Sequence, residues 1–286
     1  MDGREGRPDP RLAAADDGGS ADETVTITPR EGLRAAKAQT YEIRFKLVKK
    51  PYSFEGEGTE ANPYKINTLD DLMALEKNVN TLHHTYDGKY FLQTADINMT
   101  GVTSWKPIGY VVNTSAEYPL NATYDGGGHK ITNWAVDCDN QGSDSRYFGL
   151  FGRVSVLKNL TLDETCSFKL RAWSGTLAYQ VDSIENCVSY ATVTAQTTGD
   201  DNANASIGGL VKTAANMIDC ANCGSITVNG GGNVGGLAVD CYNATNCYNY
   251  GKVSATGTTV GGVAAELAAF GNTADEQHGV MSGCGN

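Results

Sequence analysis

GGLVKTAANMIDCANCGSITV, residues 208–228, is followed by GGLAVDCYNATNCYNYGKVSA, residues 235–255, and the two stretches share one pattern. Each opens with two glycines and a leucine, places a cysteine ten residues after that leucine, and then alternates apolar and polar side chains. Alternation with a period of two is typical of a β-strand with one buried face. The pair therefore predicts a repeated unit of short strands separated by glycine and asparagine turns.

The same unit recurs along the second half of the chain. The leading aliphatic residues are Leu150, Leu177, Leu210, Leu237 and Val263, at spacings of 27, 33, 27 and 26 residues. Ten residues after each of the first four lie Leu160, Cys187, Cys220 and Cys247. Because this offset is constant, the two columns share one register. The extra residues of the longest spacing fall between Cys187 and Leu210, where TTGDDNANAS has the composition of a loop.

More columns follow from this register. The first lies four residues after the leading column and contains Val154, Val181, Ala214, Cys241 and Leu267. The second lies six residues after the cysteine column and contains Cys166, Val193, Ile226 and Val253. The third lies two residues further on and contains Phe168, Ala195, Val228 and Ala255. All are apolar, so we expect them inside. Directly before the cysteine column stand Asn159, Asn186, Asp219 and Asn246, which we expect to bond backbone at a turn or to stack as a side-chain ladder.

These repeats predict an all-β chain built as a β-solenoid. A unit of about 27 residues with short strands cannot bury its apolar face alone, so neighbouring coils have to stack. We assign the solenoid to residues 61–286, with clear repeats over 147–286, and we expect the array to continue beyond the last unit. Strand-like segments are also expected at YFLQTADINM and WKPIGY, before the repeats begin.

The segments before the solenoid have different compositions. Residues 1–23 are rich in Gly, Asp, Arg and Pro, which indicates a disordered leader or an added extension. Residues 24–60 hold two strand-like runs and a Gly/Glu turn, which predicts a short β segment or linker. Residues 68–82 are predicted to form a helix, with Thr68 and Asp71 as a capping box and an apolar stripe that covers the end of the solenoid core.

With these repeats located, the chain resembles the GLUG-motif family, found in large surface proteins of gut and oral bacteria and in segments of bacterial immunoglobulin A proteases. The match covers roughly residues 54–286. It is carried by F-x-G-x-G-T-x-x-N-P-Y-x-I from Phe54, W-x-P-I-G from Trp105, YDGGGHKI from Tyr124, GLFG from Gly149 and IGGLV from Ile207. The resemblance implies a right-handed parallel β-helix with a structural or adhesive role and no catalytic residues in the repeats.

The eight cysteines suggest a disulfide framework or a zinc site, but most of them lie in apolar columns. Small buried thiols fit those positions, and we expect them to be unpaired. A disulfide between cysteines on adjacent coils stays an alternative, because their Cα atoms are close enough. Cys220 and Cys223 have CxxC spacing without a second pair to complete a zinc site, and they are expected to face opposite sides of the wall. We therefore expect no metal and no cofactor.

Catalytic signatures are missing from the sequence. It has no H-E-x-x-H, G-x-S-x-G or P-loop motif, and its histidines (His83, His84, His129 and His278) are not spaced as zinc ligands. Carboxylates offer two weaker candidates, because Asp137 and Asp139 flank Cys138 and Asp200 and Asp201 lie in the long insertion. We interpret the first pair as outward charge that keeps the wall soluble, and the second as a weak calcium candidate at most.

Outward tyrosines are the candidate binding residues. Tyr190 and Tyr250 occupy one column, three residues after the cysteine column, and Tyr242 and Tyr248 are also expected to face outward. Sugar rings stack on such aromatic faces. The alternative is ordinary packing of tyrosines along a sheet wall.

Three functions remain open at this point. The first is a non-catalytic extracellular adhesin or stalk whose wall contacts a host or bacterial glycan or protein; the others are an accessory segment of an immunoglobulin A-type protease and a carbohydrate-active β-helix enzyme. The net charge of -11 argues against a nucleic-acid partner, and no apolar run is long enough to span a membrane. We expect a monomer outside the cell or on its outer surface, with its signal sequence missing from this chain.

Overall fold

The structure is a computed structural model. It describes residues 22–26, 42–46, 52–112, 115–116, 118–138, 147–196, 205–230, 232–256, 259–267 and 280–286. The chain divides into two compact units, residues 1–51 and 52–286. In the first unit, β1 (Asp22–Thr26) pairs antiparallel with β2 (Glu42–Lys46). Strand β1 thus begins just inside the predicted leader, and the second unit begins at Tyr52, earlier than the predicted solenoid boundary.

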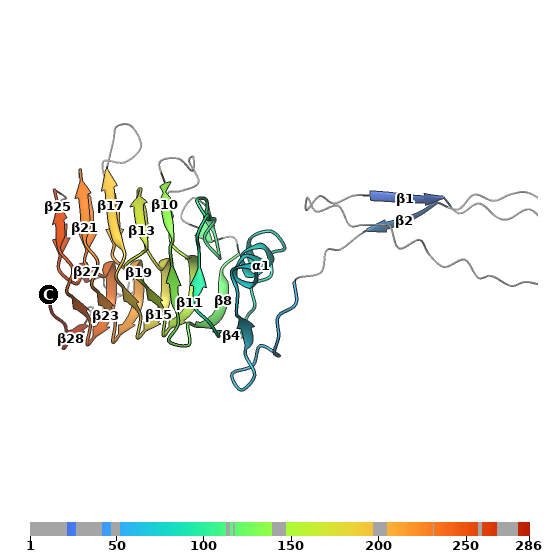
Figure 1. Ribbon diagram of the computed structural model, residues 1–286, viewed down its shortest axis with the longest axis horizontal. Coiled ribbons are helices and arrows are strands. Elements are labelled where there is room, and N and C mark those ends of the chain that lie inside the picture. Colours follow the sequence, from blue (N-terminus) through green and yellow to red (C-terminus); the bar gives the residue numbers. More distant parts are fainter. Residues whose placement is uncertain are drawn as a thin grey trace, which may run out of the picture. The chain divides into compact units, whose positions relative to one another are not determined.

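The second unit is made of parallel sheets that share one stacking direction (Figure 1). The largest sheet has nine strands: β3 (Tyr64–Ile66), β4 (Tyr90–Gln93), β8 (Leu120–Asp125), β11 (Phe151–Lys158), β15 (Ala178–Glu185), β19 (Val211–Ile218), β23 (Ala238–Thr245), β27 (Ala264–Leu267) and β28 (Val280–Ser282). Strands β11, β15, β19 and β23 lie side by side in sequence order and have equal lengths, as a stacked repeat requires.

Three further sheets complete each turn of the chain. The six-stranded sheet holds β5 (Ile97–Asn98), β9 (Lys130–Thr132), β12 (Thr161–Leu162), β16 (Val188–Ser189), β20 (Ala221–Asn222) and β24 (Tyr248–Asn249). The five-stranded sheet holds β10 (Ala135–Asp137), β13 (Ser167–Leu170), β17 (Thr192–Gln196), β21 (Ile226–Asn229) and β25 (Val253–Ala255). The four-stranded sheet holds β14 (Trp173–Gly175), β18 (Ser206–Gly208), β22 (Asn233–Gly235) and β26 (Thr259–Gly261). Strands β6 (Val111–Val112) and β7 (Ser115–Ala116) form a separate antiparallel pair.

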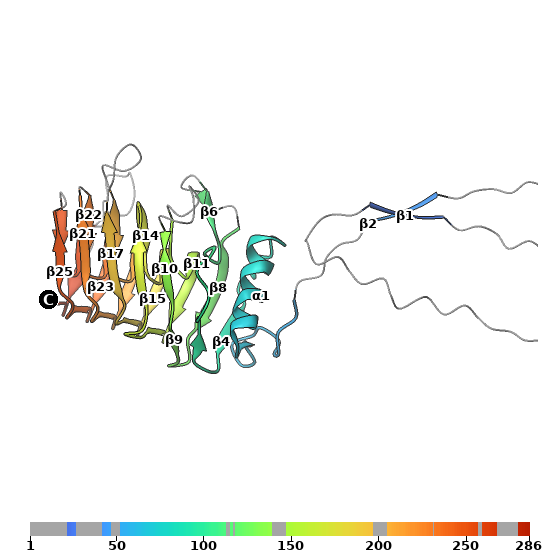
Figure 2. The ribbon, with the colours of Figure 1, turned by 45° about the horizontal axis from the view of Figure 1, so that its top comes forward.

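The chain visits the four parallel sheets in a fixed order. From β11 onward, each turn passes through the nine-, six-, five- and four-stranded sheets, and each strand pairs in parallel with its equivalent one turn later. Adjacent turns are therefore about 4.8 Å apart along the stack. This all-β arrangement of parallel strands is consistent with the predicted solenoid, and Figure 2 shows the turns stacked beside the helix.

The pairing register confirms the main apolar columns. From β11 to β23, each strand of the nine-stranded sheet pairs its first residue with the first residue of the strand one turn later: Phe151, Ala178, Val211, Ala238 and Ala264. The residues directly before them are therefore aligned as well: Leu150, Leu177, Leu210, Leu237 and Val263. All five of these leading residues are buried. The column from Val154 to Leu267 is also paired as predicted, although Leu267 is exposed on the last turn.

Two predicted columns are wrong at their first member, and their later members pair as predicted. Val193 pairs with Phe168 instead of aligning with Cys166, and Leu170, not Phe168, pairs with Ala195. The cause is a turn in the first repeat, where the Asp163 carboxylate accepts hydrogen bonds from the backbone amide and hydroxyl of Thr165. This turn adds two residues before the strand. Because the shift is even, the apolar side chains still face inward.

The asparagine column forms the corner between the nine- and six-stranded sheets. Asn159, Asn186, Asp219 and Asn246 all have left-handed backbone, with φ between 49° and 55°. Asparagine and aspartate adopt this conformation more readily than most residues. Their side chains also bond along the stack, since Nδ2 of Asn246 donates to Oδ1 of Asp219 at 3.1 Å. Of the two roles expected for this column, the side-chain ladder is therefore confirmed.

Helix α1 (Leu69–Asn80) lies beside β3 at one end of the stack (Figure 2). Thr68 caps it by accepting from the backbone amide of Asp71, whose carboxylate accepts from the backbone amide of Thr68. Leu72, Leu75 and Val79 are fully buried in the core of the parallel sheets. The helix therefore covers apolar side chains that an open stack would expose.

The predicted strand WKPIGY does not form. Trp105 instead inserts into the core, where its ring packs edge-on against Trp134 and its indole N–H donates to the Leu150 carbonyl at 3.0 Å. Ile108 makes a single bridge with Phe151. The chain thus leaves the regular stack at this point and is held by a buried indole.

Candidate functional site

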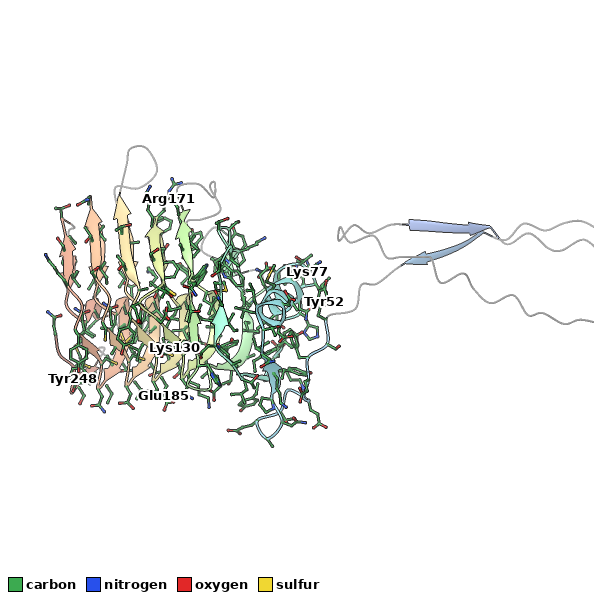
Figure 3. All side chains as sticks on the ribbon, viewed as in Figure 1. Tyr52, Lys77, Lys130, Arg171, Glu185 and Tyr248 are labelled. Atoms are coloured by element: carbon green, nitrogen blue, oxygen red, sulfur yellow. The ribbon has the colours of Figure 1, made fainter. Side chains whose placement is uncertain are left out.

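Tyr248 and Tyr250 form an exposed aromatic pair on the six-stranded sheet. Their ring centroids are 5.9 Å apart with an interplanar angle of 17°, so the rings are stacked. Their exposed fractions are 38% and 71%. Figure 3 shows Tyr248 on the outside of the stack, at the end away from the helix. The two nearly parallel rings form an aromatic surface that is accessible to solvent.

Tyr190 extends this surface along the stack. The strands of the six-stranded sheet pair Ser189 with Asn222 and Asn222 with Asn249 on successive turns. The residues that follow them in the chain are therefore aligned: Tyr190, Cys223 and Tyr250. Tyr190 is 45% exposed and lies two turns from Tyr250, with the half-buried Cys223 between them. Burial raises the pKa of the Cys223 thiol, and a hydrogen bond with Tyr190 opposes this effect. The column predicted for Tyr190 and Tyr250 is confirmed.

Tyr242 does not belong to this surface. It lies on β23 in the nine-stranded sheet and is half-buried, whereas Tyr248 lies on β24 in the six-stranded sheet. The corner at Asn246, with φ 53°, separates the two strands. We name Tyr190, Tyr248 and Tyr250 the tyrosine surface. The structure thus brings together three of the four predicted binding residues.

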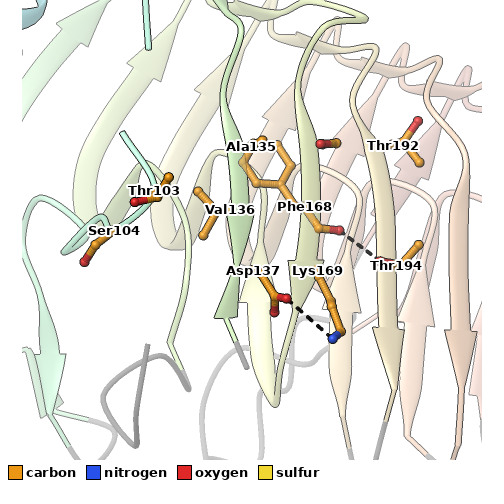
Figure 4. Close-up of a pocket in the computed structure, with 10 residues that line it drawn as sticks. Thr103, Ser104, Ala135, Val136, Asp137, Phe168, Lys169, Thr192 and Thr194 are labelled. Carbon is orange, nitrogen blue, oxygen red and sulfur yellow. Dashed lines mark hydrogen bonds and ion pairs between the residues drawn. The ribbon is translucent and has the colours of Figure 1, made fainter. Parts of the chain in front are cut away.

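A second feature was not predicted from the sequence. A hollow of about 740 Å³ lies over the outer face of the five-stranded sheet, at β10, β13 and β17 (Figure 4). Its lining comprises Thr103, Ser104, Ala135, Val136, Asp137, Ser167, Phe168, Lys169, Thr192 and Thr194. The outward side chains on these strands follow a simple alternation, but the hollow depends on the path of residues 100–105, for which the sequence gives no periodic signal.

The eight cysteines are all free thiols in this structure. Cys138, Cys166, Cys187, Cys220, Cys241 and Cys247 are buried, and Cys223 and Cys284 are partly exposed. Burial raises the pKa of Cys187 and Cys241 to about 12 and that of Cys166 to about 11. Thiols with these pKa values are protonated at neutral pH and are therefore poor nucleophiles and poor metal ligands. Cys220 and Cys223 face the interior and the outer side, as predicted from their spacing.

Of the carboxylate and histidine candidates, only some lie within the described residues. Asp137 forms an ion pair with Lys169 at 3.6 Å, while Asp139, Asp200, Asp201 and His278 lie outside the described residues. His129 contacts Asp96 at 3.3 Å, and the His83 ring stacks on Tyr118. Among the residues that the structure describes, no three His, Cys, Asp or Glu side chains gather in a metal-binding cluster. Within the same residues, no helix has the length and apolar character needed to cross a bilayer.

Part of the chain is similar in sequence to parts of longer curated proteins. Halomucin of Haloquadratum walsbyi is 33% identical over 119 residues, which make up 38% of this chain and 1% of halomucin. A "Putative Gly-rich membrane protein" of Evansella cellulosilytica is 30% identical over 115 residues, 37% of this chain and 12% of the relative. The chain therefore spans only a small part of these curated relatives.

A solved structure shares the fold. A chain described as a "putative immunoglobulin A1 protease" from Bacteroides ovatus aligns with a TM-score of 0.52 and 18% identity, covering 80% of this chain and 76% of the other. At this identity the likeness concerns the fold alone. No family model matches the chain, so membership of the GLUG-motif family is not confirmed.

Proposed function

We propose that this chain is a non-catalytic repeat module of an extracellular or cell-surface protein, acting as an adhesin or stalk that binds a glycan or protein through the tyrosine surface. The stacked pair Tyr248 and Tyr250 carries this proposal. Large exposed aromatic side chains cost solvation free energy on a monomer, and their rings are already aligned for a flat ligand. Each contact between such a ring and a ligand contributes about 1 kcal/mol beyond area burial.

The repeat architecture suits such a role. We propose a right-handed parallel β-helix, because crossover connections between parallel strands are right-handed in almost all proteins. The GLUG-type motifs at GLFG and IGGLV support a β-helix, because a Cβ at Gly149 or Gly209 would lie within 3 Å of backbone on the next turn. A stacked module of this kind holds exposed side chains at fixed intervals on a rigid wall.

The comparisons support an extracellular setting. One relative is named as a membrane protein, another as halomucin, and the structural neighbour as an immunoglobulin A1 protease. The last of these favours a second candidate function, an accessory segment of a secreted protease. In that case the chain would position a catalytic domain located elsewhere, and we expect no hydrolysis of immunoglobulin, peptide or polysaccharide by this chain alone.

Retention on a glycan and mucin array tests the proposal. We expect the double variant Tyr248→Ala, Tyr250→Ala to lose retention at least tenfold, with an unchanged melting temperature because both side chains are exposed. Tyr242→Ala is the matched control, since Tyr242 lies on another sheet. Equal retention by the double variant and the parent chain would exclude the tyrosine surface. Turnover of a substrate by the purified chain would reject the non-catalytic assignment.

A further inference from the structure

We propose that the hollow over β10, β13 and β17 is a binding groove for a neutral oligosaccharide. It lies on the five-stranded sheet, whereas the tyrosine surface lies on the six-stranded sheet. The inference therefore does not depend on the tyrosines. A volume of about 740 Å³ is within the range of small-molecule sites and accommodates several sugar rings.

The groove exists because the chain leaves the stack after β5, one turn before β10. Strand β5 pairs with β9, and Met99 still donates its backbone amide to Thr132. The chain then turns at Gly101, where φ is 87°, and β10 becomes the first strand of the five-stranded sheet. Residues Thr103 and Ser104 pass beside the sheet and form one side of the hollow (Figure 4).

This side of the groove is firmly anchored. Trp105 directly follows Thr103 and Ser104, and its ring is only 6% exposed. Its indole N–H donates to the Leu150 carbonyl, and the ring packs against Trp134. Anchoring of this kind keeps the groove open without a ligand, which lowers the ordering cost of binding.

The lining has the chemistry of a neutral, polyhydroxylated ligand. Five hydroxyl side chains line the groove: Thr103, Ser104, Ser167, Thr192 and Thr194. A hydroxyl can both donate and accept hydrogen bonds, as sugar hydroxyls do. The Thr194 hydroxyl already donates to the Phe168 carbonyl at 3.4 Å and offers a ligand its acceptor lone pairs. The charged side chains in the lining, Asp137 and Lys169, form an ion pair, so the groove carries no net charge from its described side chains. The chain's net charge of -11 additionally disfavours acidic glycans.

The spacing of these groups also matches a sugar chain. Ser167 is paired with Thr192, and Lys169 with Thr194, so polar side chains repeat from one turn to the next. Turns are about 4.8 Å apart, close to the advance per residue of an extended pyranose chain. A glycan lying along the stack would therefore meet the hydroxyls of Ser167 and Thr192 on two successive turns, whereas Ala135 occupies the same position on β10. An extended peptide advances about 3.3 Å per residue and would lose this register.

Isothermal titration with defined hexasaccharides tests the inference. The probes are neutral hexamers of glucose, mannose and galactose, with a galacturonate hexamer as the acidic counterpart. The test variant is Thr192→Val, Thr194→Val, which removes two hydroxyls and keeps the branched shape. Thr227→Val is the matched control, because Thr227 is paired with Thr194 on the next turn and lies outside the groove lining.

We expect at least one neutral hexamer to bind saturably, the double threonine variant to weaken its Kd at least tenfold, and Thr227→Val to leave it unchanged. Melting curves of all variants should coincide, since these side chains are exposed. The groove assignment would be overturned by the absence of neutral binding, by a preference for the galacturonate hexamer, or by equal loss in Thr227→Val. Loss in Tyr248→Ala, Tyr250→Ala with full binding by the threonine variant would overturn the groove while supporting the tyrosine surface.

Discussion

Nδ2 of Asn186 donates a hydrogen bond to Oδ1 of Asn159, 2.9 Å away and one turn earlier in the stack. The two residues occupy the same left-handed corner position, with φ of 49° and 55°. A single residue type thus satisfies the backbone conformation of the corner and links consecutive turns through its amide. Asp219 follows in the same column, and its carboxylate accepts from Asn246 but has no N–H to donate to Asn186.

Asp219→Asn should therefore stabilise the protein. An amide at this position keeps its acceptor for Asn246 and gains a donor for Asn186, which extends the ladder by one hydrogen bond. We expect the free energy of unfolding to rise by about 0.5 to 1 kcal/mol, the net contribution of one hydrogen bond. Chemical denaturation measures the change. Asp182→Asn is the control for lost charge, because Asp182 is an exposed carboxylate on β15; an equal gain in both variants would assign the effect to charge alone.

The corner column shows why much of this fold follows from sequence. Asn159, Asn186, Asp219 and Asn246 stand at a constant distance from the leading aliphatic residues, so their shared environment is visible as a repeat. Repeated contacts between adjacent turns make the same chemistry recur at every turn. The apolar columns were predictable for the same reason.

Other features carry no such signal. The two-residue shift at Phe168 arises from the Asp163 turn, and it preserves the alternation of buried and exposed side chains, so the sequence pattern conceals it. Tyr242 and Tyr248 both read as outward, yet the corner at Asn246 sends them to different sheets. The groove depends on a non-repeating segment held by Trp105. Irregular connections are where periodicity stops being informative.

Gly235→Ala should strongly destabilise the stack. A Cβ at this position would lie 1.6 Å from the Ala238 carbonyl oxygen and 3.1 Å from the backbone nitrogen of Ala265. Backbone on two successive turns would have to move, and we expect a loss of about 3 kcal/mol, at the upper end of overpacking effects. Thermal unfolding followed by circular dichroism measures it. Gly88→Asn is the matched control, because nothing lies within 4 Å there and asparagine tolerates its φ of 66°; similar melting temperatures for the two variants would contradict the prediction.

Native thiol labelling should distinguish two classes of cysteine. Cys223 and Cys284 are partly exposed, and we expect iodoacetamide to modify them in the folded protein. The six buried thiols should react only after denaturation, because alkylation requires an accessible thiolate. Peptide mapping by mass spectrometry identifies the modified residues, and the denatured protein should yield eight labelled thiols. Rapid labelling of Cys187 in the native state, or fewer labelled thiols after denaturation without reductant, would contradict this assignment.

Stability should fall at alkaline pH, and Cys187 contributes a defined part of that fall. Burial raises the pKa of its thiol from 9.0 to about 12, so the folded state retains a proton that the unfolded state releases above pH 9. The stabilising contribution is complete below pH 9 and is lost as the pH rises from 9 towards 12, at about 1.4 kcal/mol per pH unit for one group. Cys187→Ala removes this titration, and because Cys187 is fully buried it also lowers stability at every pH. Urea unfolding between pH 7 and 10.5 measures the free energy of unfolding of both proteins. The difference between parent and variant should be constant up to about pH 8.5, and above that pH the free energy of unfolding should decline less steeply for the variant. Parallel curves across the whole range would show that the Cys187 thiol has the same pKa in the folded and unfolded states.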